Sequence, residues 1–220
     1  MGAILQALRC LDLIHPCFIE AWSKIGPSMD SLAGHLLIAI PDLPDSNFFR
    51  SVVLLLHHDA QGAAGVILNR PSNATVAQVL NDMVSSMETS ADSSPQPIAV
   101  DSLIYLGGPV PGPLIALHGS LAWGQASVIP GLFVSSGDET LRQLIEQTEH
   151  PFKVFSGYSG WGPQQLEGEI DSGGWLTMPA EFDHVFAEAD KLWTQACEAI
   201  GREILKDRLG INFPEHPTQN

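Results

Sequence analysis

The stretch Gly157–Trp161 contains residue types that can support nucleophilic chemistry. It reads Gly-Tyr-Ser-Gly-Trp, follows an apolar run and precedes a predicted helix near Pro163. A serine between a strand and a helix can act as a nucleophile, because the helix N-terminus offers backbone N–H groups to an oxyanion. Trp161, however, stands where a Gly-x-Ser-x-Gly elbow has its second glycine. We therefore assign no catalytic residue, keep Ser159 as a candidate only, and note the alternative of a tight glycine turn.

A general base for such a serine would have to come from elsewhere in the chain. The candidates are His57, His58, His118 and His184, with Asp59 or Asp183 to orient the imidazole. His57 and His58 are adjacent on a predicted strand, so their side chains point to opposite faces and cannot serve one site. The alternative is that they mark the end of a strand before a turn.

Asn69 and Arg70 form a second candidate binding group, at the end of a predicted strand. Arg70 is one of few cations in an acidic chain, and a guanidinium can bind a carboxylate or a phosphate. It can equally hold an acidic loop of its own protein, and both interpretations stay open. Trp161 and Trp175 likewise line a partner groove or pack in the core. The predicted binding residues are Asn69, Arg70, Gly157, Tyr158, Ser159, Gly160 and Trp161.

Neither a metal nor a cofactor is predicted. The three cysteines form no Cys-x-x-Cys pair, and no Cys/His pairs have the spacing of zinc ligands. Gly107-Gly108-Pro109 lacks the spacing of a phosphate-binding loop. Unpaired cysteines of this kind are typical of reduced thiols in a cytosol, so we expect a cytoplasmic protein.

Hydrophobic periodicity predicts an α+β fold in which helices pack on hairpin-linked strands. Helices are expected from Thr75, behind Ser136, near Pro163 and over 187–205. Strands are expected over 34–40, 51–58, 63–68, 103–106, 114–118, 126–134, 152–155 and 174–178. Residues 1–28 form a predicted N-terminal appendage, 29–210 a single domain with a flexible loop near 85–98, and 211–220 a loose tail.

The charge of the chain argues against nucleic acid as a direct partner. It has 25 acidic and 10 basic residues in 220, a formal net charge of −15, and no Lys or Arg between Arg70 and Arg142. Nonspecific nucleic-acid binding needs clustered cations. No run of 18 apolar residues exists, so we expect no membrane association.

Several runs together resemble the bacterial YqgE/AlgH family. They are LAGHLLIAIPDLPDSNFFRSVVLLLHHD, GAAGVILNRP, YLGGPV, GYSGWGPQQLEGEI and GGWLTMP, in family order over residues 32–210. The resemblance implies two related β-rich subdomains in three β/β/α layers. Members are usually labelled transcriptional regulators or left uncharacterised, and no cofactor, metal or reaction comes with the resemblance. Similar chains more often have alanine in place of Ser159.

These observations leave the function unresolved between two main hypotheses. The first is a non-catalytic cytosolic binding or regulatory protein that acts indirectly on transcription through a protein or small-molecule partner. The alternative is a serine-dependent hydrolase or transferase that uses Ser159.

Overall fold

The computed structural model describes residues 31–43, 45–79, 102–146 and 150–209. The predictions for the appendage 1–28, the loop 85–98 and the tail 211–220 lie outside these residues.

The first strands form an antiparallel meander of apolar residues. They are β1 (His35–Ala39), β2 (Val52–Asp59) and β3 (Gly62–Ile67). Leu36–Ala39 and Val52–Leu55 have no exposed surface. Strands covered on both faces are continuous apolar runs without alternation, which is the pattern of these segments.

The remaining elements are further strands, with helices between some of them and at the end of the chain. In chain order they are β4 (Pro71–Thr75), β5 (Leu103–Leu106), β6 (Val110–His118), β7 (Ala126–Ile129), β8 (Leu132–Ser136), α4 (Asp138–Glu146), β9 (Phe152–Trp161), α5 (Gln165–Asp171), β10 (Trp175–Pro179), α6 (Phe182–Phe186) and α7 (Ala189–Leu209). The helix expected from Thr75 begins at residue 76, and Thr75 and Gln78 cap each other's backbone N–H groups there.

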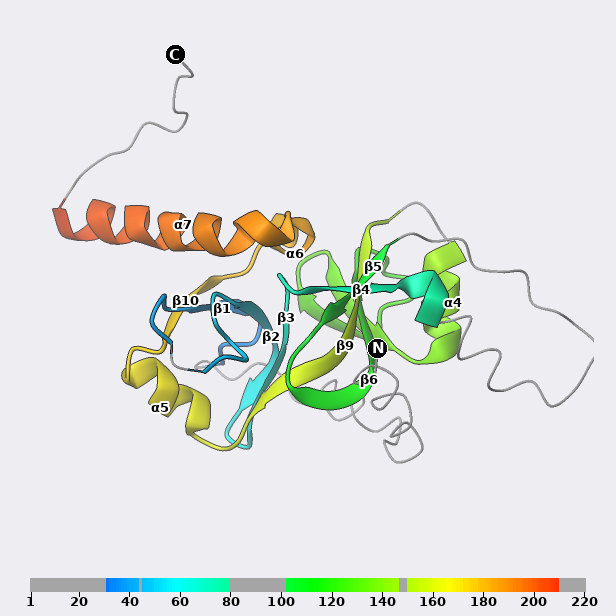
Figure 1. The fold of residues 1–220 in the computed structure, drawn as a ribbon, viewed down its shortest axis with the longest axis horizontal. Coiled ribbons are helices and arrows are strands. Elements are labelled where there is room, and N and C mark those ends of the chain that lie inside the picture. The colour runs from blue at the N-terminus through cyan, green and yellow to red at the C-terminus, as the bar shows by residue number, and fades with distance from the viewer. Residues whose placement is uncertain (1–30, 44, 80–101, 147–149, 210–220) are drawn as a thin grey trace, which may run out of the picture.

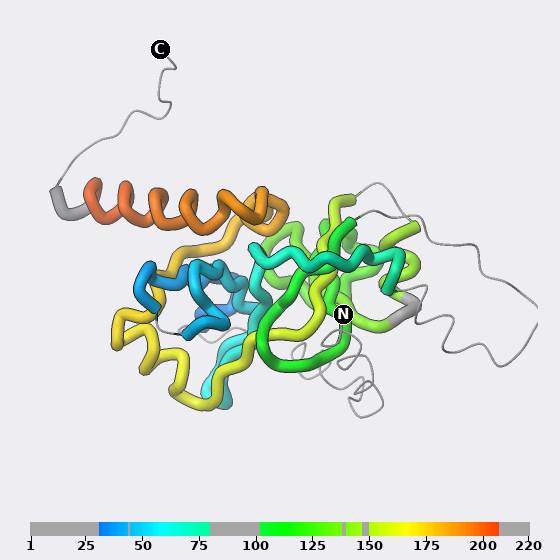
Figure 2. Tube along the Cα trace, viewed as in Figure 1, coloured from blue at the N-terminus to red at the C-terminus, as the bar shows by residue number. Residues whose placement is uncertain are grey.

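One strand joins the two halves of the molecule. The main sheet has the order β10-β1-β2-β3-β9-β6-β8-β7, so β9 pairs with β3 on one side and with β6 on the other. It also pairs in parallel with β5. The ribbon and the trace show β9 running beside the β2–β3 hairpin and on into the second half (Figures 1 and 2).

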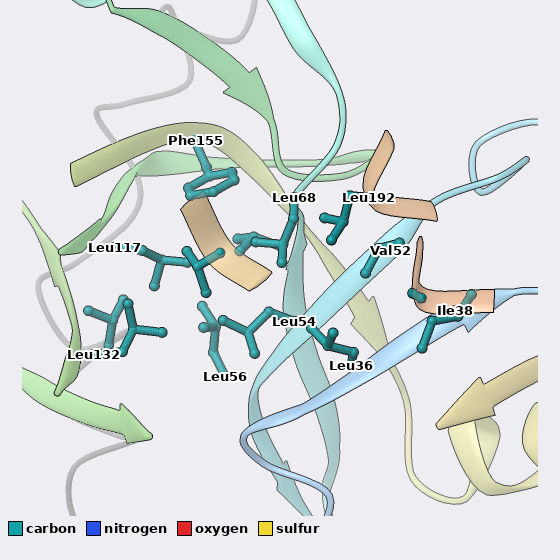
Figure 3. Close-up of a cluster of buried hydrophobic side chains, with 14 of the residues drawn as sticks. Leu36, Ile38, Val52, Leu54, Leu56, Leu68, Leu117, Leu132, Phe155 and Leu192 are labelled. Atoms are coloured by element: carbon teal, nitrogen blue, oxygen red, sulfur yellow. The ribbon is translucent and has the colours of Figure 1, made fainter. Parts of the chain in front are cut away.

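Three groups of buried side chains hold helices to this curled sheet. The largest lies beneath α6 and α7 and includes Leu54, Leu117, Phe155 and Leu192 (Figure 3). A second packs α4 against β5, β6 and β9, and a third packs α5 against β1, β2 and β3. The α+β prediction is confirmed.

The structure corrects the prediction for Gly157–Trp161. This stretch is not a turn between strand and helix but the second half of β9, which runs unbroken to Trp161. Its glycines allow close contact between backbones. A Cβ on Gly157, where φ is +72°, would lie 2.7 Å from the carbonyl oxygen of Val110, so β6 could not approach.

Candidate functional site

An irregularity in β2 determines which residues face the candidate site. The register pairs Leu55 with Gly65 but His57 with Ala64, so Leu56 is the extra residue of a β-bulge. A bulge shifts the side chains that follow it to the other face. His57 therefore lies on the same face of the sheet as Leu54, and His58 on the opposite face. The expected separation of the two histidines is confirmed.

Small residues make a hollow beside the β2–β3 hairpin. Ala64 pairs with His57 on one side and with Gly160 on the other, which aligns the three residues on one face. Two rows further toward the turn, and so on the same face, Asp59 pairs with Gly62. Because Gly62, Ala64 and Gly160 fill little space, an open groove of about 410 Å³ lies above them. We call this the hairpin groove.

The β2 wall of the hairpin groove is polar. His57 Nε2 lies 3.2 Å from Asp59 Oδ2, and both side chains are partly exposed. The other carboxylate oxygen of Asp59 accepts the backbone N–H of Gln61 at 2.7 Å. Asp59 thus has a fixed orientation at the mouth of the groove.

Tyr158 and Val110 form the opposite wall. The tyrosine ring lies between two glycines: a Cβ on Gly112 would lie 3.0 Å from its Cδ1, and one on Gly160 would lie 3.2 Å from its Cε2. Glycine at both positions gives the ring its place along the groove. Tyr158, Gly160 and Trp161, all candidates from the sequence, border this groove.

Ser159 does not border the hairpin groove. It pairs with Gly65, has no exposed surface, and its hydroxyl donates a hydrogen bond to the carbonyl of Gly107 at 3.1 Å. A nucleophile must reach its substrate, and this serine has no such access. The hydrolase alternative gains no support from this geometry.

The ring of Trp161 belongs to the core beneath α5. It is 6% exposed and stacks on Phe48 at 5.8 Å. Its indole N–H and that of Trp175 both donate to Glu169 Oε2, each at 2.9 Å. One carboxylate oxygen thus accepts a hydrogen bond from each of two buried indoles. Of the two interpretations of these tryptophans, core packing is the one that agrees with the structure.

His58 connects β2 to α5. Its Nδ1 accepts the backbone N–H of Leu32 at 2.9 Å, so the proton is on Nε2, which donates to Glu167 Oε1 at 2.9 Å. Hydrogen bonds from its own backbone and from His58 lower the pKa of Glu167. Glu167 and Glu169 therefore diverge to separate partners.

Asn69 and Arg70 lie at the far end of β3 from the hairpin groove. Asn69 accepts the N–H of Val52 and donates to the carbonyl of Arg50, each at 2.9 Å. Arg70 donates to the carbonyl of Phe49 at 3.2 Å. Burial lowers the pKa of Arg70, and the nearby charge of Asp45 opposes that change. Both side chains hold the loop before β2. This agrees with the interpretation that Arg70 holds a loop of its own protein.

His118, another candidate base, is fully buried. Its Nδ1 accepts the N–H of Ser120, and its Nε2 lies 2.9 Å from the hydroxyl of Ser135. That hydroxyl donates to the carbonyl of Trp123 at 2.6 Å. Burial, with a smaller contribution from the nearby His150, lowers the pKa of His118 to about 4. The hydrogen-bonded pair of His118 and Ser135 holds the loop after β6 and does not face the hairpin groove.

Within the described ranges, no group of three or more His, Cys, Asp or Glu side chains is arranged to hold a metal ion. No helix in those same ranges is long and apolar enough to cross a membrane.

Sequence reasoning identified part of this groove and missed the rest. His57 and Asp59 appeared only as a possible base and its orienter, because a bulge at Leu56 has no sequence signature. Ala64 and Gly62 carry no chemistry of their own. The run of small residues in Gly62–Gly65 was the one available signal of a hollow.

The fold and site define a sheet-rich α+β protein in which one curled sheet carries an open groove beside its central strand. A family model described as AlgH-like matches residues 36–205, and the chain belongs to that family.

Curated relatives and solved structures agree with this membership. A UPF0301 protein of Anaeromyxobacter sp. (strain K) is 35% identical over 77% of this chain and 88% of its own length. A UPF0301 protein of Myxococcus xanthus is 36% identical over 79% of this chain and 93% of its own length. The solution structure of the AlgH protein from Pseudomonas aeruginosa superposes with a TM-score of 0.62 at 30% identity, covering 88% of this chain and all of that one. The crystal structure of a protein from Corynebacterium diphtheriae, at 21% identity, superposes with a TM-score of 0.60. The match covers 82% of this chain and 91% of that one.

Proposed function

We propose that this protein is a non-catalytic binding protein of the bacterial cytosol that holds a small molecule or a side chain of a protein partner in the hairpin groove. The observation that carries the proposal is the groove itself, with an oriented His57–Asp59 pair facing Tyr158 across a floor without bulky side chains. Such a combination of fixed polar groups and an aromatic wall is typical of ligand sites.

The lining residues favour binding over catalysis. The described residues among them include no Ser, Thr, Cys or Lys, so the nucleophiles of serine-, threonine-, cysteine- and Schiff-base-type catalysis are not found there. Ser159 points elsewhere, and His118 is buried in a separate part of the fold.

Direct DNA binding finds little support in the contacts of Arg70 and Lys153. Arg70 donates to the carbonyl of Phe49, and Lys153 donates to the carbonyl of Ala187 while lying 4.5 Å from the ring centre of Tyr105. A chain with a net charge of −15 repels phosphate. Any effect on transcription is therefore proposed to pass through the bound partner.

The test fills the groove from its floor and keeps the buried ring of Trp161 in place. Ala64→Leu places a larger side chain on the groove floor, whereas Trp161→Ala would also remove a buried ring. Ala60→Leu, in the exposed hairpin turn outside the lining, is the matched control. Circular dichroism first confirms that both variants fold.

Native mass spectrometry of each protein after incubation with bacterial lysate then reads out binding. We expect one molecule or partner to be retained by the wild type and by Ala60→Leu, and to be lost from Ala64→Leu. Equal retention by all three proteins, or retention by none, would contradict the proposal.

A further inference from the structure

Resting on the proposed function, we propose that the hairpin groove binds a cationic nitrogen: an alkylammonium group, from a free amine or from a lysine side chain of a partner. The inference follows from the charges of the lining, the aromatic wall and the apolar floor between them.

Among the described residues that line the groove, Asp59 supplies the only permanent charge. None of them is Lys or Arg, and His57 is charged only if protonated. An anionic ligand would meet this carboxylate with no compensating cation, whereas an ammonium group would meet an opposite charge. The net charge of −15 adds a field of the same sign around the whole chain.

The carboxylate is already oriented before any ligand arrives. One oxygen accepts the N–H of Gln61 at 2.7 Å, and the other lies 3.2 Å from His57 Nε2. A side chain held in this way loses little further conformational entropy on binding, which favours affinity. Each carboxylate oxygen has a second lone pair with which to accept a hydrogen bond.

Tyr158 offers a second attraction for a cation. Its ring forms the wall opposite Asp59, placed there by Gly112 and Gly160. The face of an aromatic ring attracts ammonium groups through its quadrupole. Between the two walls, Ala64 and Gly62 leave room for the alkyl chain that carries the nitrogen.

The test uses three probes of equal chain length that differ in charge: pentylammonium, 1-pentanol and pentanoate. Backbone amide shifts of Gly62, Ala64 and Gly160 are followed by NMR at low ionic strength near neutral pH. We expect saturable shifts with pentylammonium and affinity at least about tenfold weaker for the other two probes. Equal affinity for the alcohol, tighter binding of pentanoate, or no saturable shift with pentylammonium would overturn the inference.

Two pairs of variants test the residues. Asp59→Asn keeps the acceptor for Gln61 and should weaken pentylammonium binding about tenfold, whereas Asp183→Asn removes the same charge from an exposed position in α6 and should not. Tyr158→Phe keeps the ring and should bind within about twofold of the wild type, whereas Tyr158→Leu should lose affinity. Identical behaviour of Asp59→Asn and Asp183→Asn would contradict the role of the carboxylate.

A fourth probe separates the two sources of the ammonium group. Nα-acetyl-lysine methylamide that binds more tightly than pentylammonium supports a lysine of a partner, and weaker binding supports a free amine. If Ala64→Leu loses a cellular ligand but no cationic probe binds, the inference fails and the proposed function stands. If neither the lysate nor the probes give binding at the groove, both fail.

Discussion

At the scale of single residues, His118 couples folding to pH. Its pKa is about 4 in the folded protein, against about 6.5 for an exposed histidine. Between these pH values the unfolded chain binds more protons than the folded protein does. The contribution of His118 to stability is therefore fully present above pH 6.5 and is lost as the pH drops toward 4. We expect a loss of up to ~3 kcal/mol from this group, measured as the free energy of unfolding in urea at a series of pH values.

His118→Gln isolates that contribution from those of other titrating groups. The variant has lower stability at neutral pH but cannot gain a proton at this position, so the difference between the two proteins should shrink as the pH falls. Parallel curves from pH 7 to 4 would show that His118 does not carry the effect.

Glu169 offers a second residue-scale prediction. Glu169→Gln replaces a carboxylate that accepts hydrogen bonds from Trp161 and Trp175, and hydrogen bonds to charged groups are the stronger kind. We expect a loss of about 1–3 kcal/mol. The matched control is Glu167→Gln on the same helix, whose side chain is 47% exposed, with an expected cost below about 1 kcal/mol. Urea titrations followed by tryptophan fluorescence measure both, and similar losses would refute the assigned role.

The residues of the groove were only partly predictable. Tyr158 and Gly160 stood out because an aromatic between glycines is unusual, and the structure does place both at the groove. Asn69 and Arg70 stood out for equally good reasons but hold a loop. A cation in an acidic chain has the same appearance in sequence whether it binds a ligand or a backbone carbonyl.

At the scale of elements, α7 packs on the sheet over only part of its length. Leu192, Ala196 and Ile200 are buried at intervals of four, and Ile204 continues the series at 47% exposure. Figure 1 shows the end of the helix reaching past β10 and β1. We expect Ile200→Ala to cost about 2–5 kcal/mol and Ile204→Ala less than about 1 kcal/mol. Denaturant titration measures both, and a large cost at Ile204 would mean that this end of α7 is covered in solution.

Strands were more predictable than the role of the glycines between them. The apolar runs of β1, β2 and β10 fixed their positions to within one or two residues. β9 was predicted to end at Phe155, since Gly157, Gly160 and Gly162 follow and glycine weakens strands. The local sequence cannot reveal that β6 crosses so close to Gly157 that only glycine fits.

At the scale of the whole molecule, β9 makes the two halves one structural unit. It pairs with β3 in the first half and with β5 and β6 in the second. We therefore expect a single cooperative unfolding transition. Tryptophan fluorescence, which reports all five tryptophans and among them Trp161 and Trp175 beside α5, and far-UV circular dichroism, which reports all elements, should give coincident curves in urea. Separate midpoints would show that the halves unfold independently.

The strand order also has a consequence for synthesis on the ribosome. β1, β2 and β3 are made early, yet their outer neighbours are β10 and β9, which come more than 80 residues after β3. During translation this meander of leucines and valines has two unpaired edges, the kind of surface that associates with other nascent chains. We therefore expect the first third of this polypeptide to need shielding from other chains until the last third emerges.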